Sequence, residues 1–203
     1  ELADREVPRS YGVEPGEYLL LMARMEEENN IEMILKGFTD SGTDKKILII
    51  GNIDNRFGRY LKERYGRDDR IIFTGAIFEK DTVHSLKYYS SLYFHGHSTG
   101  GTNPSLLEAM ASRALIFAHD NAFNRNVLGD DAYYFSSAGD ITLFVEGFEG
   151  GIKEKEMRLR NYEKIVGGFN WPSIITKYER YIRQSLFAFR NERNILYRRY
   201  SRQ

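Results

Sequence analysis

Short apolar runs that alternate with helical patterns constrain the fold of this chain more than any other feature. Each run has strand length and few polar residues, the pattern of a strand buried on both faces. The runs cover residues 18–23, 46–50, 70–74, 92–95, 114–118 and 132–135. Segments with helical spacing lie between them, so the repeat is about 25 residues. This alternation predicts a parallel sheet of about six strands with helices on both faces.

The flanks of the alternating region predict two further segments. Residues 1–17 are polar and carry two prolines and two glycines, which is typical of a lead-in or linker. Residues 18–170 form the predicted α/β domain. Trp171 and Pro172 interrupt a helical pattern and start a long last helix, so 171–203 is predicted as a separate C-terminal helix.

Composition excludes several classes of protein. The 203 residues have no cysteine, which excludes disulfides and thiolate metal sites. The formal net charge is zero, whereas a general nucleic-acid binder carries a basic excess. No apolar run has the ~18 residues of a membrane span. The chain starts at Glu1 without a methionine or a signal-peptide pattern, so we expect a fragment of a longer protein, with a processed complete protein as the alternative.

Residues 93–110 predict an anion site. The fourth apolar run enters a glycine-rich loop, and Pro104 then starts a helix with Asn103 as a suitable N-cap. Free backbone amides and the helix dipole attract anions at such a helix start. Helix caps are also predicted at Asn30 and Asp81. The residues expected to hold phosphate groups in this loop are Gly100, Gly101, Thr102, Asn103 and Ser105.

Several stretches together resemble a known family. They are ILIIGN, IIFTGAIFEKD, YYSSLYFHGHSTGGTNPSLLEAMAS and FNWPSIITKYERYI. They resemble the C-terminal half of a family 4 glycosyltransferase with GT-B architecture, in which two Rossmann-like domains face each other across a cleft. The spelling HGHSTGGTNPSLLEAM is similar to bacterial polysaccharide rhamnosyltransferases. The resemblance implies a nucleotide-sugar donor, no metal or other cofactor, and a cytoplasmic enzyme.

The resemblance also implies roles for single residues. Glu108 would accept hydrogen bonds from the ribose hydroxyls, Arg24 would clamp the phosphates, and the backbone near Ile77 would line the base. The family has a further glutamate where this chain has Gly100, and a lysine where this chain has Asn29. These two departures put the usual donor contacts in question.

The histidines allow more than one interpretation. His95 and His97 lie on the same side of an extended segment, and we expect a structural role for His95. His97 and Arg24 are the candidate catalytic residues, because His97 at the loop mouth could contact the donor sugar or phosphate. A zinc site would need a third and a fourth ligand, and none is evident, so we expect no metal. His84 and His119 are expected to be structural or solvated.

The remaining candidates lie near the end of the chain. Asn124 and Arg125 follow a strand and are expected in a solvated loop, although they could reach the donor. Trp171 is expected to fill part of the core. The tail from Arg183 interleaves arginines with aromatic residues, which fits a helix on an anionic membrane surface. We expect instead that it packs on the absent N-terminal domain.

The sequence therefore predicts the donor-binding domain of a glycosyltransferase, inactive without its N-terminal half. Rhamnose from dTDP-rhamnose, transferred to a polysaccharide or lipid-linked acceptor, is the most specific expectation. A non-catalytic nucleotide-sugar-binding domain and a nucleotide-sugar epimerase of the same architecture are the alternatives, because fold alone does not separate them.

Overall fold

The computed structural model describes residues 3–99 and 101–200, with side chains described as far as residue 189. Within it the chain divides into two compact units, Glu1–Glu163 and Lys164–Gln203. Each unit is described by itself below.

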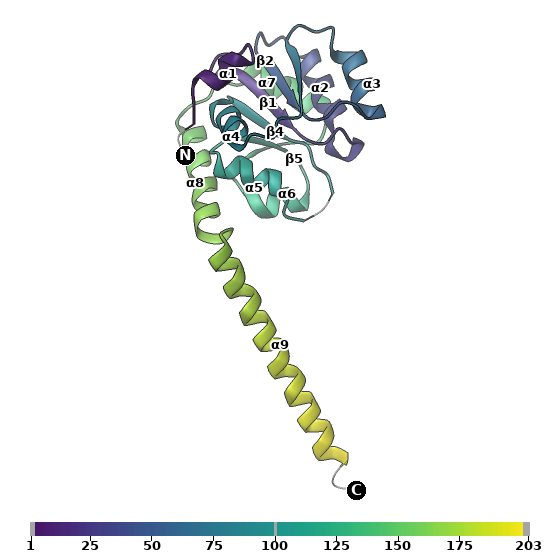
Figure 1. Cartoon of the computed structure of the whole chain (residues 1–203), viewed down its shortest axis with the longest axis vertical. Helices are drawn as coiled ribbons and strands as arrows, with labels where there is room; N and C mark the ends of the chain where they lie inside the picture. The colour runs from purple at the N-terminus through teal and green to yellow at the C-terminus, as the bar shows by residue number, and fades with distance from the viewer. Residues whose placement is uncertain (1–2, 100, 201–203) are drawn as a thin grey trace. The chain divides into compact units, whose positions relative to one another are not determined.

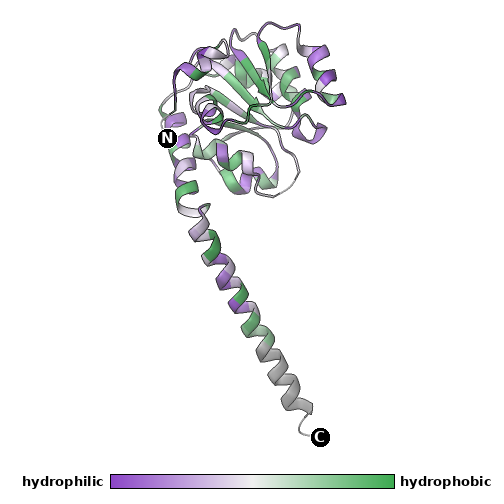
Figure 2. Ribbon diagram, in the orientation of Figure 1, coloured by the Kyte–Doolittle hydropathy of each residue, from purple (hydrophilic) through white to green (hydrophobic). Residues whose placement is uncertain are grey.

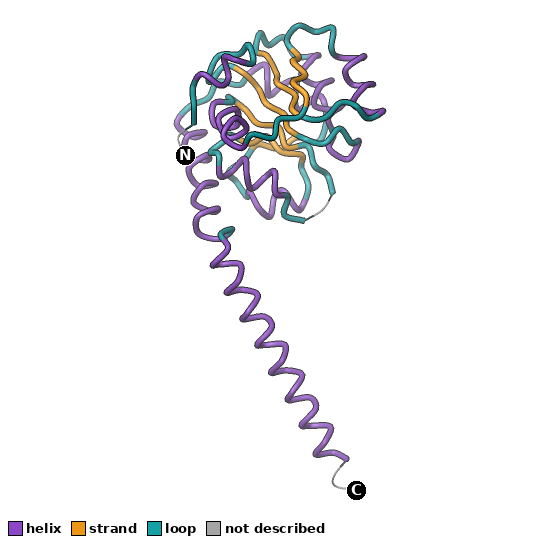
Figure 3. The backbone as a smooth tube through the Cα atoms, viewed as in Figure 1, coloured by secondary structure: helices purple, strands orange, loops and turns teal. Residues whose placement is uncertain are grey.

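The first unit is built on a six-stranded parallel sheet in the order β3-β2-β1-β4-β5-β6. Figure 3 shows the strands, in orange, at the centre of this unit with helices around them. This confirms the predicted Rossmann-like α/β fold. The order reverses between β1 and β4, so the carboxyl ends of these two strands flank a crevice, the usual ligand position in such sheets. The strands are β1 Tyr18–Met22, β2 Lys46–Ile50, β3 Ile71–Gly75, β4 Leu92–His95, β5 Ile116–His119 and β6 Tyr133–Phe135.

The helices that connect the strands fall into two packing groups. Helix α2 contacts α3 and α7, whereas α4 contacts α1 and α5. The chain runs from β1 outward to β3, and then from β4 outward to β6 on the other side of β1 (Figure 1). Right-handed crossovers in opposite directions place their helices on opposite faces of the sheet, which explains the two groups. The helices are α1 Glu6–Ser10, α2 Ile31–Asp40, α3 Arg56–Tyr65, α4 Lys80–Tyr89, α5 Pro104–Ala111, α6 Ala122–Leu128, α7 Ala138–Gly147 and α8 Ile152–Gly168, with a short 3-10 helix at Glu27–Asn29.

Burial of the strands on both faces explains why they were predictable. Every residue of β1 except Met22 is buried, as are all four residues of β4. Figure 2 shows these strands as a hydrophobic centre under more polar helices. Leu19 and Leu21 pack in a core cluster with residues of α2 and α7, and Tyr18 donates a hydrogen bond to the Leu86 carbonyl of α4 from the other face.

Two of the three predicted helix caps are wrong. Asn30 precedes α2 in a left-handed conformation, and its side chain donates to the Gly96 carbonyl at 2.7 Å instead of accepting from the helix. Asp81 lies in the first turn of α4, and Glu79 occupies the cap position. Asn103 caps α5 as predicted, because its Oδ1 accepts from the Ser105 amide at 2.9 Å.

The segment expected as a lead-in is held against α4. It contains the short helix α1, which the sequence did not predict because a five-residue helix with Pro8 in it has no apolar periodicity. The Asp4 amide donates to Ser85 Oγ at 2.9 Å, and the Gly16 amide donates to the Tyr89 carbonyl at 2.7 Å.

The second unit holds the end of α8 and the long helix α9, Trp171–Tyr200, which starts at the predicted break. The core position predicted for Trp171 is wrong, because 76% of this side chain is exposed. The described part of the second unit holds only helices, so no strand of this unit covers the indole. Across the described residues, no helix combines the length and apolarity that crossing a bilayer requires.

Candidate functional site

A cleft of about 750 Å³ lies at the carboxyl edge of the sheet, where the loops after β1, β2, β3 and β4 meet. Six of the predicted site residues line this cleft: Arg24, Ile77, His97, Asn103, Ser105 and Glu108. Gly101 and Thr102 belong to the same loop but do not line it. Gly100 lies outside the described residues. The parallel topology therefore gathers residues that are up to 84 positions apart in sequence.

The start of α5 offers fewer free amides than the sequence suggests. Pro104 has no amide proton, and the Ser105 amide and hydroxyl both donate to Asn103 Oδ1, at 2.9 and 2.8 Å. The expected phosphate contact from the Ser105 amide therefore needs correction, since the N-cap already uses that group. In the described part of the chain, the amides of Thr102 and Asn103 have no hydrogen-bond partner. These two amides and the helix dipole remain for an anion.

Arg24 follows β1 and is the cationic residue of the cleft lining. It forms no ion pair with Glu26 or Glu28, although both carboxylates line the same cleft. Its loop is fixed by Asn29, whose side chain donates to the Arg24 carbonyl at 2.7 Å. Asn29 thus stabilises the loop at the position where the resemblance implies a lysine, and Arg24 keeps its guanidinium available to a ligand.

His95 and His97 are both kept neutral by their surroundings. Burial lowers the pKa of His95 to about 3, with a smaller contribution from His97 and Lys87. Burial also lowers the pKa of His97, and the nearby positive charge of Arg24 lowers it further. Both ring nitrogens of His95 and Nδ1 of His97 lack a hydrogen-bond partner among the described residues. A neutral His97 can donate or accept a hydrogen bond in the cleft, but it adds no positive charge there.

The loop that carries His97 is fixed from two sides. Asn121 and Asn124 donate to the His97 carbonyl at 2.9 and 3.1 Å, and the Ser98 amide donates to the Glu28 carbonyl at 3.0 Å. Asn124 is 4% exposed, so the expected solvated position is wrong for this residue. Arg125 does lie at the surface, where it pairs with Asp120.

Gly96 allows the loops after β1 and β4 to touch through their backbones. A Cβ atom at this position would lie 2.0 Å from the carbonyl oxygen of Asn29 and 3.0 Å from its carbonyl carbon. Backbone cannot move aside as a flexible side chain can, so only glycine fits here without a shift of one loop.

Glu108 has a partner that the sequence analysis missed. Lys87 Nζ of α4 lies 2.9 Å from Glu108 Oε2, and the exposed fractions of the two side chains are 1% and 61%. Burial lowers the pKa of Lys87, which the Glu108 carboxylate partly opposes. The helical spacing of Val83, Leu86 and Ser90 already places Lys87 on the inner face of α4, and this spacing is the signal that could have found it.

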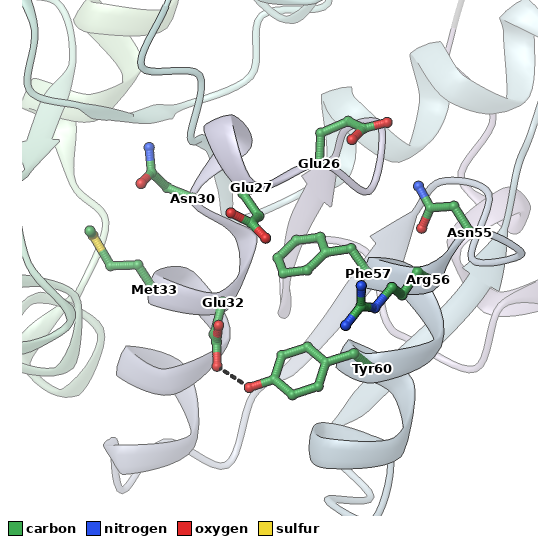
Figure 4. Close-up of a pocket in the computed structure, with 9 residues that line it drawn as sticks. All are labelled: Glu26, Glu27, Asn30, Glu32, Met33, Asn55, Arg56, Phe57 and Tyr60. Atoms are coloured by element: carbon green, nitrogen blue, oxygen red, sulfur yellow. Dashed lines mark hydrogen bonds between the residues drawn. The ribbon is translucent and has the colours of Figure 1, made fainter.

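A second groove lies between α2 and α3. Figure 4 shows it lined by Glu26, Glu27 and Glu32, with Arg56 as the cation of its lining. Tyr60 donates to the Glu32 carboxylate at 2.6 Å. Three carboxylates and one guanidinium line this groove, and the cleft beside Arg24 has the same balance with Glu26, Glu28 and Glu108. The cleft is the better candidate for a diphosphate because it lies where the strand order reverses between β1 and β4, the usual ligand position in such sheets.

Within the described residues, no three histidine or acidic side chains gather closely enough to hold a metal ion.

Three solved structures illustrate what the fold resembles. The C-terminal domain of LpcC, a glycosyl transferase group 1 family protein from Francisella tularensis, matches with a TM-score of 0.64 at 17% identity, over 82% of this chain and 93% of that one. A glycosyltransferase from Rickettsia africae matches with a TM-score of 0.74 at 13% identity, over 92% and 53%. Anabaena HepE, solved in complex with UDP and glucose, matches with a TM-score of 0.71 at 11% identity, over 91% and 52%. This chain therefore spans about half the length of the last two.

None of the curated proteins matches this chain. The family model for glycosyl transferases group 1 matches residues 4–165. That match covers the whole sheet and every lining residue of the cleft described above. The chain belongs to the glycosyl transferases group 1 family.

Proposed function

We propose that this chain is the donor-binding half of a GT-B glycosyltransferase, and that the cleft at the carboxyl edge of the sheet holds a nucleoside diphosphate sugar. The observation that carries the proposal is the meeting of Arg24, the start of α5 and Glu108 in one cleft. A cation and free amides suit a diphosphate, and a carboxylate suits the sugar hydroxyls of the nucleoside, which are two in UDP or GDP and one in dTDP. Ile77 lies on the wall from the loop after β3, where a base can pack.

The proposed chemistry is electrostatic. When the bond between sugar and diphosphate ionises, the sugar becomes oxocarbenium-like and negative charge accumulates on the leaving diphosphate. Arg24 and the amides of Thr102 and Asn103 would stabilise that charge in place, which is preorganised catalysis. Neutral His97 would hydrogen-bond the donor sugar or its phosphate oxygen, and it replaces part of what the glutamate absent at position 100 supplies elsewhere in the family.

The identity of the donor rests on two separate arguments. HepE, a structural neighbour, was solved with UDP and glucose and also with UDP-glucose, which favours a uridine donor. The loop HGHSTGGTNPSLLEAM favours rhamnose from dTDP-rhamnose. We propose a hexosyl donor of this class, a saccharide acceptor held by the other half of the enzyme, and a cytoplasmic site of action.

A non-catalytic binding domain is the second candidate. The observation that favours it is the reduced charge of the cleft, where Asn29 supports a loop instead of offering a second cation. A nucleotide-sugar epimerase would use the same cleft. Turnover by the longer protein with dTDP-rhamnose or UDP-glucose distinguishes the three, since an epimerase needs no saccharide acceptor.

Calorimetric titration of this chain with UDP, dTDP and GDP tests the donor site. Binding of at least one, with an affinity lowered about tenfold by Arg24→Gln, supports the proposal, because one charge-assisted hydrogen bond is worth about 1.5 kcal/mol or more. Arg56→Gln is the matched control, because Arg56 lines the second groove and not the cleft. Flat titrations with all three nucleotides at millimolar concentration would reject the donor site.

The C-terminal helix α9 is proposed to contact the other half of the enzyme. Its described part exposes aromatic and aliphatic side chains, among them Tyr178, Tyr181 and Phe187. The alternative is peripheral contact with an anionic membrane, which the arginines of the tail favour. Co-sedimentation of the chain with vesicles of anionic lipid at low salt separates the two, and sedimentation that disappears at high salt would favour the membrane.

A further inference from the structure

We propose that Lys87 is a positioning residue for the donor site, which holds the Glu108 carboxylate from inside the protein so that its remaining oxygen faces the ribose hydroxyls. This inference rests on the proposed function of the cleft. It assigns a role to a residue that lines no part of the cleft itself.

Lys87 is almost completely buried. Lysine is almost never fully buried unless it is paired, because the charged ammonium loses its hydration. Here 1% of the side chain is exposed, and the ammonium lies between α4, β4 and α5, with the Tyr93 ring centroid 5.9 Å away. Its hydrogen bond goes to Glu108 Oε2. The ammonium therefore depends on this carboxylate for its partner.

Glu108 is far more exposed than its buried partner. Its side chain is 61% exposed, so without the bond to Lys87 it would be free to change rotamer. A bond to a buried and immobile partner removes most of that freedom before a ligand arrives. Fixing such a side chain on binding has a cost in conformational entropy. Lys87 thus contributes that ordering in the unliganded protein, and it occupies Oε2 while Oε1 stays available.

The positive charge of Lys87 also reduces the repulsion between Glu108 and a diphosphate. A carboxylate that shares a cleft with a diphosphate repels it, and the repulsion is strongest where water is displaced. The positive charge of Lys87 lies on the protein side of Glu108 and offsets the carboxylate charge. Because Lys87 does not enter the cleft, it offsets this charge without competing with the ribose for space.

The experiment compares a nucleotide with its analogue that lacks the ribose hydroxyls. Lys87→Met keeps the approximate volume and removes the charge, and Lys80→Met, an exposed lysine on the same helix, is the matched control. Each variant is titrated calorimetrically with UDP and with 2′,3′-dideoxy-UDP, or with the dTDP or GDP pair if the unmodified chain binds that nucleotide more tightly. The expected result is about a tenfold loss of affinity for UDP in Lys87→Met, with no loss for the dideoxy analogue and no change in Lys80→Met.

A second comparison separates positioning from a general effect on the fold. In a Glu108→Gln background, Lys87→Met should cause no further loss of UDP affinity, because the group that it orients is gone. Lys87→Arg, which retains the charge, should recover part of the affinity. Affinity for UDP within twofold of the unmodified chain in Lys87→Met would overturn the inference, and so would equal losses for UDP and the dideoxy analogue.

A measurement on the unmodified chain covers the case in which Lys87→Met does not fold. With lysine labelled by ¹³C at Cε, the Lys87 resonance should shift on saturation with UDP and stay in place with the dideoxy analogue. An unmoved resonance at saturating UDP would overturn the inference. If the unmodified chain binds none of the nucleotides, the proposed function itself fails, and the role of Lys87 fails with it.

Discussion

The imidazole rings of His95 and His97 stack face to face, with centroids 4.6 Å apart and planes inclined by 12°. His95 is buried at the end of β4, and His97 lines the cleft two residues later. Two rings this close cannot both be protonated at low cost, and burial already disfavours the charged form of His95. A buried, neutral ring therefore supports the imidazole of His97 in the cleft from inside the protein.

Replacement of His95 should flatten the dependence of stability on pH. The pKa of His95 is about 3 in the folded chain, against about 6.5 in the unfolded chain. Neutral His95 therefore contributes to the free energy of unfolding above pH 6.5, and this contribution is lost as the pH falls towards 3. The loss attributable to this residue between pH 7 and pH 5 is about 2 kcal/mol. Urea denaturation at both pH values should show a smaller drop in His95→Gln than in the unmodified chain. Equal drops would contradict the pKa assigned to His95.

Alanine at Gly96 should destabilise the chain far more than alanine elsewhere in the same loop. The added methyl would meet the Asn29 backbone at 2.0 Å, so one loop must shift, at a cost of about 2–3 kcal/mol. Gly101 is the matched control, since a Cβ there meets nothing within 4 Å. Urea denaturation of both variants measures the effect, because a lower midpoint at an unchanged m-value reports a loss of stability. Similar midpoints for the two would contradict the backbone contact.

Removal of Glu108 should affect stability as well as ligand binding. Glu108→Gln leaves the Lys87 ammonium buried without its charged partner, and we expect a loss of about 2 kcal/mol after allowing for the exposure of Glu108. The double variant with Lys87→Met should regain most of this loss, because the buried charge is gone. Thermal and urea unfolding of the three variants measures the coupling, and additive losses would contradict it.

Arg158 of α8 should be important for the stability of the first unit. Its guanidinium donates to the carbonyls of Ser90, Ser91 and Arg113 at 3.1 to 3.2 Å, and burial lowers its pKa. Arg158→Ala leaves these carbonyls without a donor and should cost about 3 kcal/mol in free energy of unfolding. Lys36→Ala, which removes an exposed pair with Asp40, should leave unfolding unchanged. A comparable effect of both substitutions would contradict this role.

The sequence predicted the sheet and much of the cleft because both depend on local patterns. Strands buried on both faces are apolar throughout, so all six were found, and the ends of parallel strands meet at one edge whatever the details of packing. This rule points to the loop that starts at Arg24, and the capping preference of asparagine points to Asn103. Glu108, inside a helix, was predicted from the family resemblance alone.

What the sequence could not provide depends on contacts between distant segments. The helical spacing of α4 places Lys87 on the inner face, but only the proximity of α5 gives it a carboxylate partner. Asn30 has the residue type of a helix cap, but a carbonyl 66 positions away takes its side chain instead. For Lys87 and Asn30 the deciding neighbour is remote in sequence. Trp171 is apolar and predicted in the core, yet this residue is 76% exposed.

The backbone contact at Gly96 has a consequence for protein engineering. The loop after β4 rests on Asn29, and Asn30 and Glu28 hold the same loop by bonds to Gly96 and Ser98. The two loops therefore form a single module. A graft that moves only the histidine-containing loop into another scaffold would lose its support, so the loop should keep its conformation in such a chimera only when residues 24–30 and 95–99 are exchanged as a pair.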